Sequence, residues 1–289
     1  MNLQSATGHG VNGTQVVNFS FTNGKINNAS RASDHSCVSF DDLNAANASG
    51  TLTFTNNQCT QTEANGVDVE NWGATLSDVN MSNNQFTDTG DVATPGFNAN
   101  SAVGCAGIAV GTDDPAGVGA GTHTTPISGN NVTGTDGPGI FPIVRNSGST
   151  MTARVTNNTV AAAIATNAAR AGIRVDSGSA VGDTTLCLEI SGNTTAGSTN
   201  TATATTSPGI NLRKQGTDPA INTFGIEGLS PSPTGTPNVG EPREFDQHEY
   251  VRNIRRGRHG SALRPIWVHE LHSPVTARRS HLPDALSSA

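Results

Sequence analysis

Two adjacent carboxylates, Asp113 and Asp114, are by type and spacing the residues best suited to acid–base chemistry in this chain. Paired carboxyl groups can cleave a glycosidic bond when one protonates the leaving oxygen and the other activates a water molecule. Here the pair lies in a glycine-rich stretch, residues 111–121, and Pro115 follows it directly, which is typical of a turn. Asp113 and Asp114 are therefore kept as the catalytic candidates of the chain, but a structural turn is the favoured interpretation.

The cysteines offer either disulfides or buried thiols. There are four of them, Cys37, Cys59, Cys105 and Cys187. No C-x-x-C spacing occurs and Cys37 alone has a histidine nearby, so a structural zinc site is not predicted. Two disulfides could form by any of three connectivities, whereas single thiols buried inside a repeat explain the same residues as well. The sequence leaves both alternatives open.

Composition favours a solenoid over a large layered core. Hydrophobic residues make up 34% of the chain, aromatic residues 4% and charged residues 13%. Small polar side chains stack well on identical neighbours in a repetitive sheet. Residues 1–239 carry 8 Lys and Arg against 17 Asp and Glu, whereas residues 240–289 carry 8 against 6. Because an acidic body repels phosphate backbones, no nucleic-acid partner is expected, and no apolar run reaches the roughly 20 residues of a membrane span.

Two short sequence units alternate along the chain. The first is an alternating apolar strand that runs into an Asn-containing turn, at residues 52–57, 79–84, 127–131, 155–158 and 188–193, with a weaker copy at 19–24. The second is a glycine followed by alternating apolar residues, at residues 66–69, 107–110, 139–140, 172–175 and 209–212. Repetition of this kind indicates a repeat architecture in which each unit packs on the next.

The two units predict an all-β, right-handed parallel β-helix. Period-two alternation indicates strands with one buried face, and Gly or Asn at their ends allows the positive φ angles of sharp corners. We expect one continuous interior that contains Val67, Val69, Ile108, Val110, Ile140, Ile173, Val175, Ile210 and Leu212. An Asn at a repeated corner should bond to its equivalent one coil away. Within residues 160–170, several alanines leave a short helix or an inserted loop as alternatives.

The Ile-Ser-Gly-Asn corners, the Gly-Ile strands and residues 188–212 resemble the bacterial parallel β-helix and β-strand repeat proteins, including autotransporter passenger regions. The resemblance covers about residues 15–239. It implies a non-catalytic cell-surface or secreted module, similar to an adhesin, whose partner is a surface polysaccharide or a host or cell-surface protein. The same scaffold also carries polysaccharide-degrading enzymes, so a divergent pectin lyase-like or polygalacturonase-like enzyme is the alternative.

The enzyme alternative fits the sequence less well. Hydrolases of this shape have an Asp pair followed later by Gly-His-Gly, whereas here Gly8-His9-Gly10 precedes Asp113 by about a hundred residues. Lyases of this fold need calcium-binding acids and a basic residue. The candidates for those roles are Asp41, Asp42, Asp176 and Asp183, with Arg170 and Arg174. Arg174 and Asp176 share a strand face by parity, which we interpret as a solvated cross-strand ion pair. No metal, cofactor or catalytic site is predicted.

Composition changes again toward the end of the chain. We expect the β-helix domain to span residues 1–229, a Pro/Ser/Thr linker residues 230–239 and a basic, His- and Arg-rich tail residues 240–289. The tail is expected to be disordered or translated out of frame. No signal peptide is visible, and because residues 16–21 already look like a mid-repeat strand, we expect that the beginning is missing. Export and any membrane attachment would then depend on a missing leader, anchor or translocator.

Overall fold

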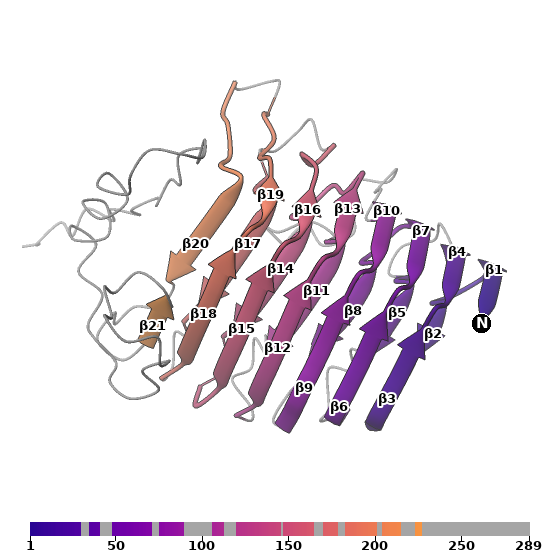
Figure 1. Cartoon of the computed structure of the whole chain (residues 1–289), viewed down its shortest axis with the longest axis horizontal. Helices are drawn as coiled ribbons and strands as arrows, with labels where there is room; N and C mark the ends of the chain where they lie inside the picture. The colour runs from indigo at the N-terminus through magenta and orange to yellow at the C-terminus, as the bar shows by residue number, and fades with distance from the viewer. Residues whose placement is uncertain are drawn as a thin grey trace, which may run out of the picture.

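The computed structural model shows a right-handed parallel β-helix, as the repeat predicts (Figure 1). It describes residues 1–29, 35–40, 48–70, 75–89, 106–112, 120–145, 147–164, 170–178, 183–200, 204–214 and 223–226. Its strands form three parallel sheets of seven strands each, here called sheets A, B and C. The chain visits A, B and C in turn, so that each coil contributes one strand to each sheet. The coils are stacked in chain order, as the colour gradient of Figure 1 shows.

The strands of each sheet recur at every third position in the chain. Sheet A consists of β1 (Asn2–Ala6), β4 (Lys25–Ala29), β7 (Gln58–Thr62), β10 (Gln85–Thr89), β13 (Asn131–Thr133), β16 (Thr159–Val160) and β19 (Thr194–Thr195). Sheet B consists of β2 (Val11–Asn12), β5 (Val38–Phe40), β8 (Val67–Glu70), β11 (Ile108–Thr112), β14 (Ile140–Val144), β17 (Ile173–Ser177) and β20 (Ile210–Lys214). Sheet C consists of β3 (Val16–Thr22), β6 (Ala48–Thr55), β9 (Thr75–Ser82), β12 (Thr122–Ser128), β15 (Thr150–Thr156), β18 (Thr185–Ser191) and β21 (Thr223–Ile226).

The predicted interior is confirmed. In sheet B, Ile108 pairs with Val67 on one side and with Ile140 on the other, and the column continues through Ile173 to Ile210. Eight of the nine predicted residues are buried in one core cluster, and Ile210 packs against that cluster while partly exposed. Stacked columns of Val, Ile and Leu fill the narrow interior, which explains why few aromatic residues are needed.

A ladder of asparagines lines the corner between sheets C and A, as the repeat predicts. Its members are Asn57, Asn84, Asn130, Asn158 and Asn193, and the Nδ2 of each of the first four donates to the Oδ1 of the next. The same Oδ1 atoms accept the backbone N–H of the preceding ladder residue. Each ladder residue follows a corner residue with φ between 56° and 66°, for example Asn83 or Gly129. This left-handed conformation explains why only Asn and Gly occupy the corner position.

Sheet B differs from the expectation of one buried face per strand. Every residue of β11, β14 and β17 is buried. On the outward face, Ala109, Phe141 and Ile143 form a second apolar cluster with Ala106. The outward residues of sheets A and C are instead mostly polar and solvent-accessible, as in β12, where buried and accessible residues alternate.

The cysteines divide between the two alternatives left open above. Cys37 and Cys59 form a disulfide with a Cα–Cα distance of 6.1 Å, and both residues are buried. Cys187 is a free thiol, and it is exposed on the outward face of β18, so the interpretation as a buried thiol is wrong for this residue. The physical reason is that side chains alternate between the two faces of a strand: Leu186 and Leu188 point into the interior, so Cys187 between them points outward. Cys105 lies outside the described residues.

Two further expectations concern the chain after β16. Residues 161–164 have no regular secondary structure, so no helix occupies this described part of residues 160–170. Instead, the backbone N–H of Ala161 donates to Val132 O at 2.9 Å. The proposed linker and tail, residues 230–289, lie outside the described residues, and the expectation for them stays a prediction. In the ranges that are described, the structure contains no helix that is long and apolar enough to cross a membrane.

Candidate functional site

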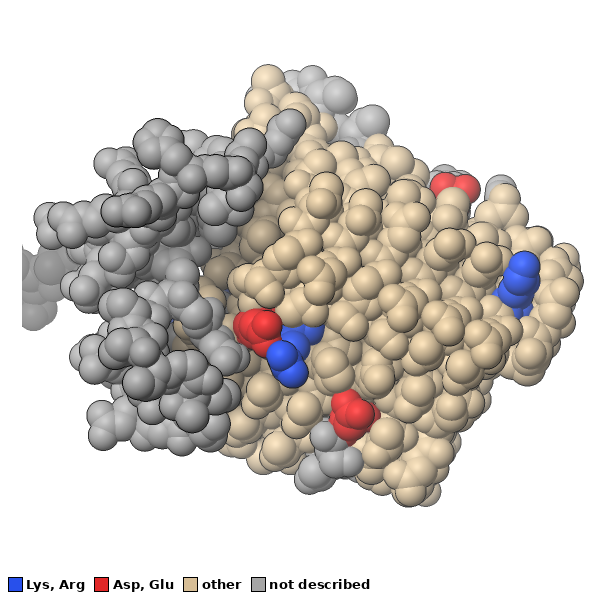
Figure 2. Space-filling model, viewed as in Figure 1, with Lys and Arg blue, Asp and Glu red and all other residues tan. Residues whose placement is uncertain are grey.

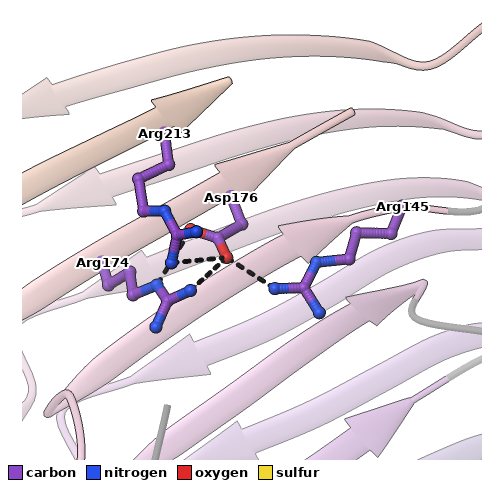
Figure 3. A network of polar contacts seen from close by, with 4 residues as sticks. All are labelled: Arg145, Arg174, Asp176 and Arg213. Atoms are coloured by element: carbon purple, nitrogen blue, oxygen red, sulfur yellow. Dashed lines mark hydrogen bonds and ion pairs between the residues drawn. The ribbon is translucent and has the colours of Figure 1, made fainter. Parts of the chain in front are cut away.

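Three charged side chains of sheet B, and one that directly follows a strand of this sheet, gather at one place on its outward face. Arg174 and Asp176 come from β17, Arg213 comes from the neighbouring strand β20, and Arg145 directly follows β14 on the other side. We call these four residues the arginine cluster. Figure 3 shows that the three guanidinium groups converge on the single carboxylate of Asp176.

The Asp176 carboxylate is fully enclosed. Its Oδ2 accepts from Arg174 at 2.6 Å and from Arg145 at 2.7 Å, and its Oδ1 accepts from Arg174 Nε at 2.9 Å. Arg213 approaches Oδ2 at 3.8 Å. The side chain of Asp176 is 0% exposed and that of Arg174 7%, whereas Arg145 and Arg213 are 25% and 27% exposed. A carboxylate held this way is a poor proton acceptor for a substrate because its lone pairs already accept hydrogen bonds.

The expectation of a solvated cross-strand ion pair is therefore wrong in two respects. The Arg174–Asp176 pair is buried, and both residues belong to one strand; the cross-strand partners are Arg145 and Arg213. Parity placed the pair on the outward face correctly, but the outward residues of β17 are buried as well. The Arg174 guanidinium also lies 5.1 Å from the centre of the buried Phe141 ring, a cation–π contact that supports its burial.

The electrostatics of the cluster are unbalanced. Burial lowers the pKa of Arg213; Asp176 raises it, while Arg174 and Arg145 lower it further. Burial also lowers the pKa of Arg170, with Arg174 acting in the same direction and Asp136 opposing both. Each of these two arginines is thus partly desolvated and lies near at least one other guanidinium group.

Of the other candidate residues, the structure describes Asp183 and Arg170. Asp183 is exposed just before β18, and its side chain makes no hydrogen bond or ion pair within the described part of the chain. Arg170 lies just before β17, where its backbone N–H donates to Ser198 Oγ at 2.8 Å. Asp113, Asp114, Asp41 and Asp42 lie outside the described residues, so their predicted roles stay predictions. Among the residues that are described, no three His, Cys, Asp or Glu side chains meet in a way that could hold a metal ion.

The three histidines that the structure describes occupy two separate positions. His9 and His35 meet edge to face with ring centroids 4.9 Å apart, and Ser36 N donates to His9 Nδ1 at 3.1 Å. Burial lowers the pKa of His9, and the nearby His35 adds to this effect. His123 instead points into the interior from β12, is 1% exposed, and has its pKa lowered to about 4 by burial. The sequence signal that could have predicted this position is the even spacing between His123 and Ile127, which places both side chains on the inward face of β12.

Sequence reasoning also missed Arg145 and Arg213. A usable signal exists for Arg213, because it stands four residues after Gly209, as Asp176 stands four residues after Gly172. Aligning the Gly-Ile units therefore places Arg213 beside Asp176, which is the register observed. No such signal exists for Arg145, since it follows the end of its strand.

Uncharged polar side chains form rows across the outward faces of sheets A and C. One row on sheet C runs through Thr22, Thr55, Ser82, Ser128, Thr156 and Ser191. Within it, Thr55 and Ser82 share a hydrogen bond of 3.2 Å. On sheet A, Thr60 donates to Asn27, and Asn27 donates to Gln4. Figure 2 shows a face of the molecule on which charged side chains are few.

Neither the arginine cluster nor the polar rows identify a family by themselves. Comparison of the chain with protein-family models, with curated proteins and with solved structures gives no match in any of the three.

Proposed function

We propose that this chain is a non-catalytic β-helix module of a bacterial cell-surface or secreted protein, similar to an autotransporter passenger. Its role would be adhesion, in which the outward rows of sheets A and C contact a surface polysaccharide or a host or cell-surface protein. Hydroxyl and amide side chains repeated in register can donate and accept many hydrogen bonds to such a partner without any chemistry.

The observation that carries this proposal is the state of Asp176. It is the one sequence-predicted acid that joins a charged cluster in the described residues, and three arginines neutralise and enclose it. A glycosidase needs two carboxyl groups that face the substrate, and a lyase needs acids that are free to bind calcium. A buried carboxylate saturated by guanidinium groups serves neither purpose, which favours a structural role.

The test combines a turnover assay with a binding assay on the purified full chain. Polygalacturonate and neutral polysaccharides are incubated with and without calcium, and reducing sugar and unsaturated products are followed. No turnover is expected. Turnover that disappears in Asp113→Ala, Asp114→Ala or Asp176→Asn would refute the proposal and favour the polysaccharide-degrading alternative.

Binding is measured by surface plasmon resonance over immobilised surface polysaccharides and matrix glycoproteins. We expect retention that falls when Thr156→Lys disrupts the hydroxyl row of sheet C. The matched control is Ala162→Lys, which adds the same charge at an exposed position after β16, outside the strands of sheets A and C. Retention that neither substitution affects, or no retention on any surface, would contradict adhesion through these faces.

A further inference from the structure

Arg213 has hydrogen-bonding capacity that the protein does not use. Its guanidinium makes no hydrogen bond in the described part of the chain, and its one ion pair, to Asp176 Oδ2, spans 3.8 Å. The side chain is 27% exposed, so solvent reaches it. A guanidinium presents five N–H donors in a planar fork that matches a carboxylate. Arg213 can therefore receive an oxyanion without breaking an existing hydrogen bond.

The surrounding charge favours such an oxyanion. The arginine cluster places three guanidinium groups around one carboxylate, and Asp176 accepts its short hydrogen bonds from Arg145 and Arg174. Arg213 is the member that Asp176 compensates least, because Coulomb attraction weakens with distance. A second negative charge beside Arg213 would also relieve the repulsion from the other two arginines.

Asn211 provides a second group on the same face. It precedes Arg213 by two residues in β20, so both side chains point outward, about 7 Å apart along the strand. The Oδ1 of Asn211 is buried and has no hydrogen-bond partner. A buried amide oxygen left in this state costs free energy, and rotation of the partly exposed Asn211 side chain toward solvent would let a ligand hydroxyl donate to it.

We propose that Arg213 and Asn211 form a binding site for an acidic sugar, with its carboxylate on Arg213 and a ring hydroxyl on Asn211. The ligand chemistry follows from the pair: a sugar acid carries a carboxylate and hydroxyl groups on one ring. The acidic body of the chain, with 17 Asp and Glu against 8 Lys and Arg in residues 1–239, disfavours densely charged polyanions. The preferred ligand is therefore a saccharide with isolated acidic residues.

This site lies on sheet B, whereas the proposed adhesive rows lie on sheets A and C, so either proposal can fail without the other. The test is a titration of the full chain with sodium glucuronate, followed by saturation-transfer NMR. Saturable binding with a dissociation constant of about 1 mM is expected. Glucose, which lacks the carboxylate, and acetate, which lacks the hydroxyls, should each bind at least about tenfold more weakly, since each loses one contact.

Variants assign the binding to this site. Arg213→Gln should weaken glucuronate binding about tenfold or more, and Asn211→Ala should weaken it several-fold. The matched control is Lys25→Gln, which removes one positive charge at an exposed position in β4 and should leave binding unchanged. Arg213→Lys retains the charge but loses the fork and should fall between. Thermal unfolding of each variant verifies that it is folded.

Several results would overturn this assignment. They are an absence of saturable glucuronate binding to the unmodified chain, acetate binding as tight as glucuronate binding, or equal losses in Arg213→Gln and Lys25→Gln. Full retention of glucuronate affinity in a folded Arg213→Gln variant would overturn it as well.

Discussion

Truncation of Asn130, at the centre of the asparagine ladder, should destabilise the protein far more than its position at a turn suggests. Its Nδ2 donates to Met81 O at 2.8 Å and to Asn158 Oδ1 at 2.9 Å. Its Oδ1 accepts Asn84 N at 2.9 Å and Asn84 Nδ2 at 3.0 Å. Asn130→Ala therefore removes four hydrogen bonds at a site that is 1% exposed, where water cannot readily replace them.

The magnitude follows from the groups left without a partner. In Asn130→Ala, the backbone N–H of residue 130 still donates to Asn158 Oδ1. Three other groups lose the hydrogen bond that they make to the Asn130 side chain: Asn84 N, one hydrogen of the Asn84 amide and Met81 O. An unsatisfied buried group costs about 1–3 kcal/mol. The expected loss of unfolding free energy is therefore about 3–6 kcal/mol. Because Asn84 loses its partner when Asn130 is truncated, the Asn84→Ala/Asn130→Ala double variant should cost less than the sum of the single variants.

Urea unfolding followed by circular dichroism measures these differences as midpoints and slopes. Asn193→Ala, at the partly exposed end of the ladder, should cost about 1–2 kcal/mol because water reaches that position. Asn131→Ala, on the exposed side of the same corner, should stay within about 0.5 kcal/mol. Equal losses for Asn130→Ala and Asn193→Ala, or a loss below about 1 kcal/mol for Asn130→Ala, would refute the argument from buried hydrogen bonds.

Three further predictions address the core, the interior histidine and the disulfide. Ile173→Asp places a charge at a 0% exposed position between Ile140 and Ile210 and should lower the free energy of unfolding by about 4 kcal/mol or more. Thr152→Asp, on the exposed face of β15, should cost little. Equal effects of the two variants in urea unfolding would contradict the register. Burial lowers the pKa of His123 from 6.5, the value of an unperturbed histidine side chain, to about 4 in the folded chain. The unfolded chain therefore takes up the proton first, and the free energy of unfolding should fall by about 3 kcal/mol as the pH is lowered from 6.5 to 4. His123→Leu, which matches Leu186 in the same column, should remove that part of the pH dependence, and an unchanged slope would show that other groups cause it. Reduction of Cys37–Cys59, which closes a separation of 22 residues, should lower stability by about 3 kcal/mol, while Cys187→Ser should leave the effect of reductant on thermal unfolding unaltered.

Local patterns predicted the interior and the corners of the fold because both depend on near neighbours in the sequence. Alternation after Gly66, Gly107 and Gly172 determines which side chains point inward, and stacking then aligns them. The asparagine ladder followed from the same logic, since a residue that recurs at one corner meets its own copy in the next coil.

The remaining features depend on contacts between distant segments, which one sequence does not reveal. Arg174 and Asp176 look like surface residues by type, and their burial depends on what covers the outward face of sheet B. The partner of Cys37 could not be chosen among three connectivities by spacing. Arg145 joins the cluster from a position just beyond β14, where strand parity no longer applies. These are tertiary effects, and they involve the residues that matter most for the candidate site.

The asparagine ladder also bears on how the molecule responds to mechanical force. Each ladder residue bonds only to the coils directly above and below, so a pull on one end should peel off one coil at a time. Successive ladder residues are separated by 27, 46, 28 and 35 residues. At about 3.4 Å per extended residue, each detached coil would release roughly 90 to 160 Å of chain. A protein built this way would yield under tension in discrete steps and dissipate energy at each one, instead of failing in a single event.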